Sequence, residues 1–448
     1  MIKMIKMIKF KAIIALILIG GCFFSWWLLR PNLHEENVRA DHETLIISSY
    51  GKILNFNLEN NKIQWQYQSK FNLSGNRNYF SLSDNILLQP FESGELIAFN
   101  LNTGKILWQE HIFGEGKGMG FAVATPDGID PDYVNSLKPL FMTQPLMTKE
   151  NVYITSTNQP MSTNIPALYS FGKNTGTINF VQDLPTVFNF FKPVEFNGFI
   201  FVNSAVFLNL YDKKSGDQKN YGTYILSTDD ENTKPNQFSN PIYAQMLSDG
   251  QSLFVGDENG KFYALKFDGN NNISGAVTSD PDNTFIKNSK LFKWKFSDDA
   301  IGSIHADGRA HLYKNYLLTA VNLSDKTEQS IIAINKKNGK LIWKADLQGI
   351  DKWALIDDKV IASNRGGIYI LDMDGKITGN IKIPSEFAVI SNIEVDRNGD
   401  FYFATEKGIA KLEMKTQKIN IILQQNFIKD EHDYFQIKYL KRNSGSSL

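Results

Sequence analysis

Two histidines and an aspartate stand close together in the segment HADGRAH. They are His305, Asp307 and His311, and imidazole and carboxylate groups are ligands that suit zinc or iron. The same segment contains Asp307-Gly308, a dipeptide typical of tight turns. Because the chain has six histidines, a chance cluster arises easily. A turn is therefore the favoured interpretation, and we predict no metal site here.

Oxygen donors gather in two other segments, Asp396-Arg-Asn398-Gly-Asp400 and Asp268–Asn272. Calcium loops combine such side chains, but they have a defined spacing and a closing bidentate Glu, which both segments lack. Between strands, Asp, Asn and Gly are ordinary turn residues. We also find no convincing Ser/His/Asp order and no nucleophilic cysteine. The sequence thus predicts no catalytic residue, no bound cofactor and no metal.

A glycine-rich segment, GEGKGMG at 114–120, opens an insertion that continues to about Thr148. Phosphate loops place such glycines between a strand and a helix, but here prolines follow instead of a helical pattern. A surface loop fits better, and long loops on a rigid scaffold are where partners bind. Phe121, Phe141 and Met142 are the predicted apolar contacts for a partner. The alternative is that they pack against the neighbouring sheet.

Short strands must position these segments, because the chain repeats a strand–turn–strand pattern. Gly94–Trp108 has two apolar runs around Asn102-Thr103-Gly104, and Gly51–Trp65 matches it in register. A period of about 40–50 residues built from strands and turns is typical of a β-propeller. Eight such units can be counted along residues 43–425. We therefore predict an all-β fold, an eight-bladed β-propeller of four-stranded antiparallel blades.

Tryptophan recurs at one position in the last strand of a unit, and a phenylalanine, Phe180, takes that position in the third unit. The four tryptophans are Trp65, Trp108, Trp294 and Trp343. We predict that each packs against the next blade and stabilises the ring by roughly 2–4 kcal/mol. The first unit lacks an inner strand, and a spare β-like run, Tyr434–Leu440, follows the eighth. This run should pair with the first blade, closing the ring and removing open edges.

The N-terminus has the features of a membrane segment. Four lysines precede the uncharged run Ala12–Leu29, which can just span a bilayer and would leave the following residues outside the cytoplasm. Alternatively, Ile19-Gly20-Gly21-Cys22 resembles a lipobox, and Cys22 would then be lipidated as the first mature residue. We expect an anchor or signal at 1–30, a linker at 31–42, the propeller at 43–440 and a disordered tail at 441–448.

Composition narrows the classes of function. Lys and Arg number 47 together, as do Asp and Glu, so the formal net charge is zero. Nucleic-acid binding needs a basic footprint, which this balance does not supply. Hydrophobic residues make up 42% of the chain, enough for a core. Because Cys22 is the single cysteine, the propeller can contain neither a disulfide nor a thiolate metal site.

The unit signature, an apolar strand followed by a turn and Gly-Lys-x-x-Trp, resembles the repeat of pyrroloquinoline-quinone (PQQ) type propellers. Gly94–Trp108 and Ser330–Trp343 match it best. One branch of that superfamily comprises quinoprotein alcohol and sugar dehydrogenases, whose site needs a quinone, a calcium ion, a catalytic Asp and often a cysteine pair. No stretch here can be matched to those calcium ligands or to the base, and no cysteine follows Cys22.

The other branch is the propeller lipoprotein of the outer-membrane β-barrel assembly machinery. That family is non-catalytic, envelope-tethered, eight-bladed and of about this size, and the chain resembles it in its plan of anchor, linker and ring. The resemblance implies a membrane-anchored, monomeric periplasmic scaffold whose partner is an envelope protein, such as a β-barrel assembly component. Two alternatives remain open: a quinone-dependent dehydrogenase with an unusual site, and a module that binds a ligand in its central channel.

Overall fold

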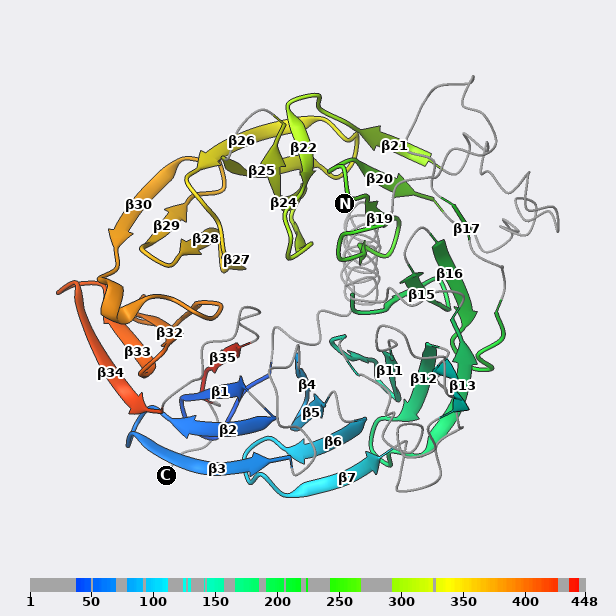
Figure 1. Ribbon diagram of the computed structural model, residues 1–448, viewed down its shortest axis with the longest axis horizontal. Coiled ribbons are helices and arrows are strands. Elements are labelled where there is room, and N and C mark those ends of the chain that lie inside the picture. Colours follow the sequence, from blue (N-terminus) through cyan, green and yellow to red (C-terminus); the bar gives the residue numbers. More distant parts are fainter. Residues whose placement is uncertain are drawn as a thin grey trace, which may run out of the picture.

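The computed structural model describes residues 38–49, 51–69, 79–91, 94–111, 124–125, 128–129, 141, 143–156, 166–184, 191–204, 207–218, 223–224, 242–266, 292–324, 328–425 and 435–442. These residues form eight antiparallel sheets arranged radially around one axis (Figure 1). The predicted all-β, eight-bladed propeller is confirmed. None of the described residues forms a helix that could cross a membrane, and Ala12–Leu29 and Cys22 lie outside them.

The first four blades follow the chain in order, except that blade one takes its innermost strand from the C-terminus. Blade one contains β35 (Gln436–Leu440), β1 (Thr44–Ser49), β2 (Lys52–Asn57) and β3 (Lys62–Gln68). Blade two contains β4 (Ser81–Ser83), β5 (Ile86–Pro90), β6 (Glu95–Asn100) and β7 (Ile106–His111). Blade three contains β10 (Leu146–Met147), β11 (Asn151–Thr155), β12 (Ala167–Gly172) and β13 (Ile178–Asp183). Blade four contains β14 (Val194–Phe196), β15 (Phe199–Ser204), β16 (Phe207–Asp212) and β17 (Thr223–Tyr224).

The second half of the ring differs only in blade six, which has five strands. Blade five contains β18 (Leu247–Ser248), β19 (Leu253–Gly256), β20 (Phe262–Leu265) and β21 (Phe292–Phe296). Blade six contains β22 (Ile301–Ile304), β23 (Ala310–Tyr313), β24 (Tyr316–Leu323), β25 (Gln329–Asn335) and β26 (Leu341–Leu347). Blade seven contains β27 (Lys352–Ile356), β28 (Lys359–Asn364), β29 (Gly367–Leu371) and β30 (Ile377–Lys382). Blade eight contains β31 (Glu394–Val395), β32 (Phe401–Thr405), β33 (Gly408–Glu413) and β34 (Lys418–Gln424). Outside the blades lie the hairpin of β8 (Ala124–Thr125) and β9 (Gly128–Ile129) and a 3-10 helix, Ser385–Phe387.

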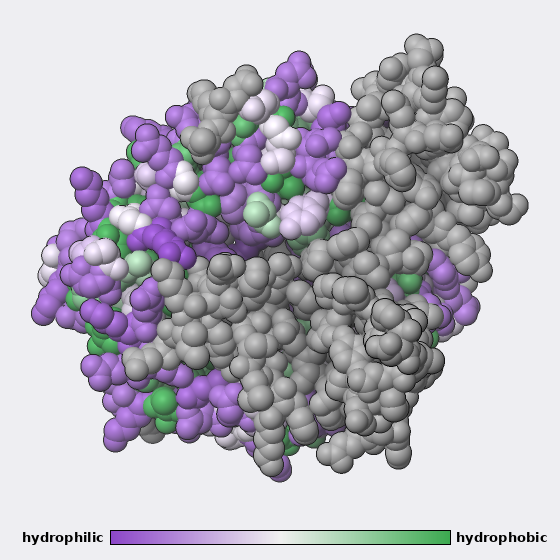
Figure 2. Space-filling model, viewed as in Figure 1, coloured by the Kyte–Doolittle hydropathy of each residue, from purple (hydrophilic) through white to green (hydrophobic). Residues whose placement is uncertain are grey.

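The core lies between blades. The second and third strands of a blade are apolar without alternation, as in β6, where Leu96, Ile97, Ala98 and Phe99 are all fully buried. Such runs form because both faces of the strand pack against a neighbouring blade. Outer strands have mostly exposed and half-buried positions, and where Figure 2 shows described residues the surface is largely hydrophilic. Eight large aliphatic side chains among the described residues are exposed. They are Ile63, Ile106, Leu107, Ile178, Val181, Leu341, Ile342 and Ile377.

The C-terminal strand closes the ring, as predicted. β35 pairs antiparallel with β1, with Ile47 opposite Ile437 and Thr44 opposite Leu440. Blade one is therefore built from both ends of the propeller, and its inner edge is covered. The strand starts two residues after the predicted Tyr434.

The two faces of the disc differ in the lengths of their connections. Because strands alternate in direction, the connections between first and second and between third and fourth strands share one face. Most are tight turns, such as 101–105 and 372–376, although 266–291 is a long exception. We call this the tight-turn face. At the opposite face the outer strand of a blade ends and the inner strand of the next begins, as at His111 and Leu146, or at Lys382 and Glu394. We call it the long-connection face.

Candidate functional site at the hub

The inner edge of blade six is interrupted. β22 and β23 both pair with β24, β22 near Leu323 and β23 near Tyr316. Residues 305–309 between them leave the sheet as a turn, in which the Gly308 N–H donates to the His305 carbonyl at 2.9 Å. We call these five residues the hub loop. The segment HADGR thus forms the turn that its Asp-Gly pair predicted.

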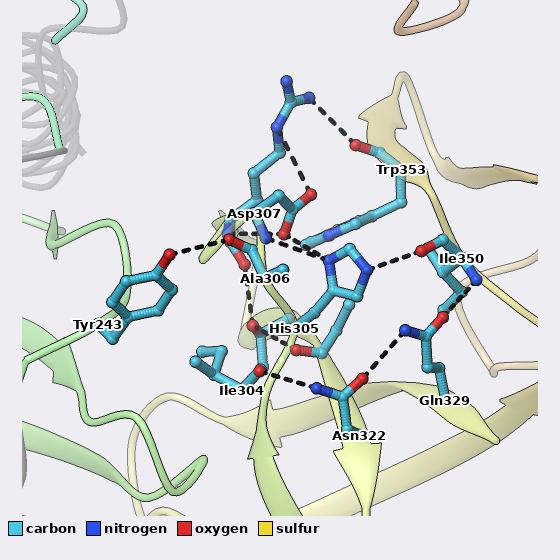
Figure 3. A network of polar contacts seen from close by, with 12 residues as sticks. Tyr243, Ile304, His305, Ala306, Asp307, Asn322, Gln329, Ile350 and Trp353 are labelled. Carbon is cyan, nitrogen blue, oxygen red and sulfur yellow. Dashed lines mark hydrogen bonds and ion pairs between the residues drawn. The ribbon is translucent and has the colours of Figure 1, made fainter. Parts of the chain in front are cut away.

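The hub loop is fastened to blade five on one side (Figure 3). The Tyr243 hydroxyl donates to the Ala306 carbonyl at 3.3 Å, and the Gln245 N–H donates to the Gly308 carbonyl at 2.7 Å. Gly308 has φ +57°, and a Cβ there would lie 2.5 Å from the Phe191 ring. Only glycine satisfies both the backbone conformation and the close approach.

On the other side the hub loop reaches blade seven. His305 Nε2 lies 2.7 Å from the Ile350 carbonyl oxygen, and Arg309 donates from Nη1 to the Trp353 carbonyl at 3.3 Å (Figure 3). The loop therefore joins three consecutive blades through four hydrogen bonds.

An ion pair lies inside the loop. His305 Nδ1 is 2.9 Å from Asp307 Oδ1, and the two side chains are 7% and 12% exposed. Burial by itself would lower the pKa of His305, but the Asp307 carboxylate and the Ile350 carbonyl outweigh it and raise that pKa above its usual range. Burial by itself would raise the pKa of Asp307, but the neighbouring His305 and Arg309 outweigh burial and lower that pKa below its usual range. The structure thus favours a charged imidazolium opposite a charged carboxylate.

His311 does not join this pair. Its ring stands edge-on to the Trp353 indole, with centroids 5.0 Å apart, in the contact between blades six and seven. Burial, with Arg309 nearby, lowers the pKa of His311 to about 4, so the ring is neutral at ordinary pH. In the part of the chain that the structure describes, no group of three His, Cys, Asp or Glu could hold a metal ion.

Elsewhere at the hub, amide side chains bind both the N–H and the carbonyl of one residue in the adjacent blade. We call these pairs amide clamps. They are Gln245 with Lys192, Gln436 with Phe80, and Asn392 with Ile437. In the last pair Asn392 donates to the Ile437 carbonyl at 2.8 Å and accepts its N–H at 2.9 Å. Each clamp replaces the hydrogen bonds that another strand would make.

Glu394 on β31 is a further buried hub carboxyl. It accepts the Tyr439 N–H at 3.2 Å and the Asn392 amide at 3.3 Å, and the Lys438 ammonium lies 3.5 Å away. Burial raises the pKa of Glu394 despite the attraction of Lys438. These contacts run from blade eight to blade one, so this carboxyl also ties neighbouring blades together.

At the rim, each phased indole donates its N–H to a carbonyl in the next blade. Trp108 donates to Lys173 at 2.7 Å, and its ring covers Gly176, where a Cβ would lie 2.7 Å from the ring. The equivalent pairs are Trp65 with Leu101, Trp294 with Lys336, and Trp343 with Met373. Phe180 covers Gly216 in the same way, without a donor.

The predicted partner contacts need a correction. Phe141 is fully buried between blades two and three and packs edge-on against Tyr169, with centroids 5.8 Å apart. It is part of the core, because an aromatic side chain of this size is stabilised by burial more than by solvent contact. Phe121 and Met142 lie outside the described residues.

The Asp396 segment is a turn. Asp396 Oδ1 accepts the N–H groups of Asn398 and Asp400 at 2.8 and 3.0 Å, and Oδ2 accepts the Tyr402 hydroxyl at 3.2 Å. Asp400 is paired with Lys411 at 2.9 Å. These oxygens are engaged within the blade. Asp268–Asn272 lies outside the described residues.

No protein-family model matches the sequence, and no curated protein matches it. Several solved structures match the fold of this chain. BamB from Moraxella catarrhalis aligns with a TM-score of 0.54 at 13% identity, over 84% of this chain and 95% of that one. Quinohemoprotein alcohol dehydrogenase from Comamonas testosteroni aligns with a TM-score of 0.53 at 10% identity, over 84% of this chain and 70% of that one. The chain therefore shares its propeller fold with these two proteins. The dihydro-heme d1 dehydrogenase NirN shares it too, with a TM-score of 0.53 at 11% identity, over 87% of this chain and 75% of that one.

Proposed function

We propose that this chain is a non-enzymatic scaffold of the cell envelope, anchored by its N-terminal segment, whose propeller binds a protein partner on the long-connection face. The partner is an envelope protein, such as a component of β-barrel assembly. The observation that carries the proposal is that the amide and charged side chains of the hub bind groups of the neighbouring blades, mostly backbone N–H and carbonyl groups. A ring braced at both hub and rim is a rigid platform.

The fold likeness to BamB and the repeat's resemblance to the propeller lipoprotein of the assembly machinery support this role. The long-connection face is the preferred docking face because loops on a rigid scaffold carry recognition. All connections between blades meet there, whereas the opposite face consists mostly of tight turns that complete the rim contacts.

Site-specific photo-crosslinking in cells tests the face. A benzophenone amino acid is placed at Arg365 or Glu406 on the long-connection face, and at Asp374 or Lys415 on the tight-turn face as matched controls in the same two blades. All four positions are exposed turn residues. We expect adducts with an outer-membrane assembly protein, identified by mass spectrometry, from the first pair only.

Adducts from the tight-turn positions alone would overturn the choice of face, and adducts with no envelope protein from any position would overturn the scaffold role. Dye-linked alcohol oxidation by the purified protein after addition of PQQ and calcium would overturn the non-enzymatic assignment.

A further inference from the structure

We propose that the His305–Asp307 pair is a pH-dependent latch, which fastens the hub loop to blades five and seven while His305 is protonated and releases it when the proton is lost. This inference concerns the rigidity of the ring and stands apart from the proposed partner.

The shortest contacts of the His305 ring favour a proton on both nitrogens, although the Asp307 N–H also lies 3.4 Å from Nδ1. Nε2 faces the Ile350 carbonyl at 2.7 Å, and Nδ1 faces the Asp307 carboxylate at 2.9 Å. Both oxygens can only accept, so a neutral imidazole can satisfy one of them at a time. Loss of one proton therefore breaks a hydrogen bond within the loop or the hydrogen bond to blade seven.

Asp307 depends on that proton. Its Oδ1 also accepts the Arg309 N–H at 3.1 Å, but Oδ2 is buried without a hydrogen bond among the described residues. The Arg309 Nε is 3.7 Å from Oδ2, too far for a strong bond. A neutral His305 would leave a carboxylate with 12% exposure beside one distant guanidinium, and such a charge is costly to bury. The loop is then expected to open so that the carboxylate is hydrated.

Other charged groups around His305 modify the latch without replacing it. Lys352 on β27 of blade seven opposes the charge on His305, and Arg309 lies on the loop itself. From blade five the facing group is the Tyr243 hydroxyl, which donates to the Ala306 carbonyl. His311 is neutral above about pH 4. Asp307 is thus the one anion that the structure places in contact with the His305 ring among these groups.

The direction follows from the raised pKa of His305. Protonated His305 stabilises the closed loop, because the pKa of His305 is higher in the closed loop than in the open loop. This stabilisation is complete below the pKa of the open loop, near 6.5, and it disappears as the pH rises through the pKa of the closed loop. Between these two pKa values the equilibrium constant for opening the loop rises about tenfold per pH unit. The latch is therefore closed below about pH 6.5 and loosens as the pH rises through the raised pKa of His305.

Hydrogen exchange measured by mass spectrometry on the full-length purified protein tests the latch. Peptides covering 301–313 and 350–356 are followed from pH 5.5 to 9 after correction for the intrinsic exchange rate. We expect protection that falls with pH in the wild type and is low and independent of pH in His305→Gln. His42→Gln is the matched control, because His42 also pairs with a carboxylate, Glu59 at 3.2 Å, but on the surface. It should retain the wild-type profile.

Asp307→Asn supplies a second, independent variant. It removes the anion but keeps the loop length, so the pKa of His305, followed by NMR of labelled histidines, should fall below the wild-type value. Wild-type protection that does not change with pH, or a His305 pKa that is the same in wild type and Asp307→Asn, would overturn the latch.

Discussion

The rim and the hub hold the same blades together by different chemistry. At the rim, Trp108 and its equivalents fill the space between blades with an indole and make a single hydrogen bond. At the hub, the amide clamps and the hub loop join blades mainly through hydrogen bonds. The rim contacts bury the large surface of an aromatic ring, whereas the hub clamps satisfy single backbone N–H and carbonyl groups. Burial therefore supplies most of the stability at the rim, while hydrogen-bond geometry sets the register at the hub.

The ring closure is the place where hub contacts matter most, since one strand, β35, takes part in two of the three amide clamps described above. Deleting residues 435–448 removes β35 with its buried side chains, which are Phe435, Ile437, Tyr439 and Leu440. At about 1.5–3 kcal/mol for each, we expect a loss of roughly 6 kcal/mol or more and an open β1 edge that promotes aggregation. Chemical unfolding and light scattering measure both effects. Deleting only 443–448 is the control, and a loss of comparable size there would contradict the assignment of closure to β35.

At the rim the largest effect should come from Trp108→Ala. The side chain is 7% exposed, and truncating a buried Trp typically costs about 3–5 kcal/mol. Trp108→Phe separates packing from the hydrogen bond to Lys173, because Phe180 already occupies this position in blade three. It should cost about 1–2 kcal/mol, measured by urea unfolding. Equal losses in the two variants would mean that the hydrogen bond, and not burial, dominates at the rim.

The rim could be predicted from the sequence and the hub could not, for a physical reason. Trp65 and Trp108 stand at a fixed distance from a turn that repeats along the chain, so each contact has a local signature. Asn392 and Gln436 bind residues in other blades that are distant along the chain, and an isolated amide beside a short strand gives no pattern. The inner strands β10, β18 and β31 have two residues each, too few to show alternation.

The hub loop was predicted only in part. Asp307-Gly308 indicated a turn, but the Ile350 carbonyl that His305 contacts lies 45 residues further on, and no sequence pattern relates the two. The prediction that Phe141 contacts a partner was wrong because its sequence signal is ambiguous. An apolar residue in a long insertion looks the same in the sequence whether it contacts a partner or is buried in the core.

Asn392→Ala tests whether the clamps carry a measurable share of the stability. The substitution leaves the N–H and carbonyl of Ile437 without their partner at a buried site. Each such group costs about 1–3 kcal/mol, so we expect a loss of roughly 2–4 kcal/mol in thermal or urea unfolding. Asn380→Ala, at an exposed position of β30, is the control and should change stability by less than about 0.5 kcal/mol. A loss as small as that of the control would show that water replaces the clamp at little cost.

The smallest expected change in stability comes from two Gly→Ala variants, which together separate packing from backbone strain. Gly176 and Gly250 have φ of +71° and +80°, and Ala at either position incurs a strain of about 1–2 kcal/mol. At Gly176 a Cβ would also lie 2.7 Å from the Trp108 ring, whereas at Gly250 it would meet nothing within 4 Å. Gly176→Ala should therefore be less stable than Gly250→Ala by about 1–2 kcal/mol, the cost of displacing the indole.

A double-mutant cycle assigns that difference to the indole. In a Trp108→Ala background, Gly176→Ala should cost no more than Gly250→Ala, because the ring that it would contact is gone. Retention of the full difference would mean that the glycine is required by the turn alone. The spacing of Trp and Gly along the units would then reflect two separate constraints, one on the turn and one on the strand. The rim would in that case be stabilised mainly by the buried aliphatic residues between its blades.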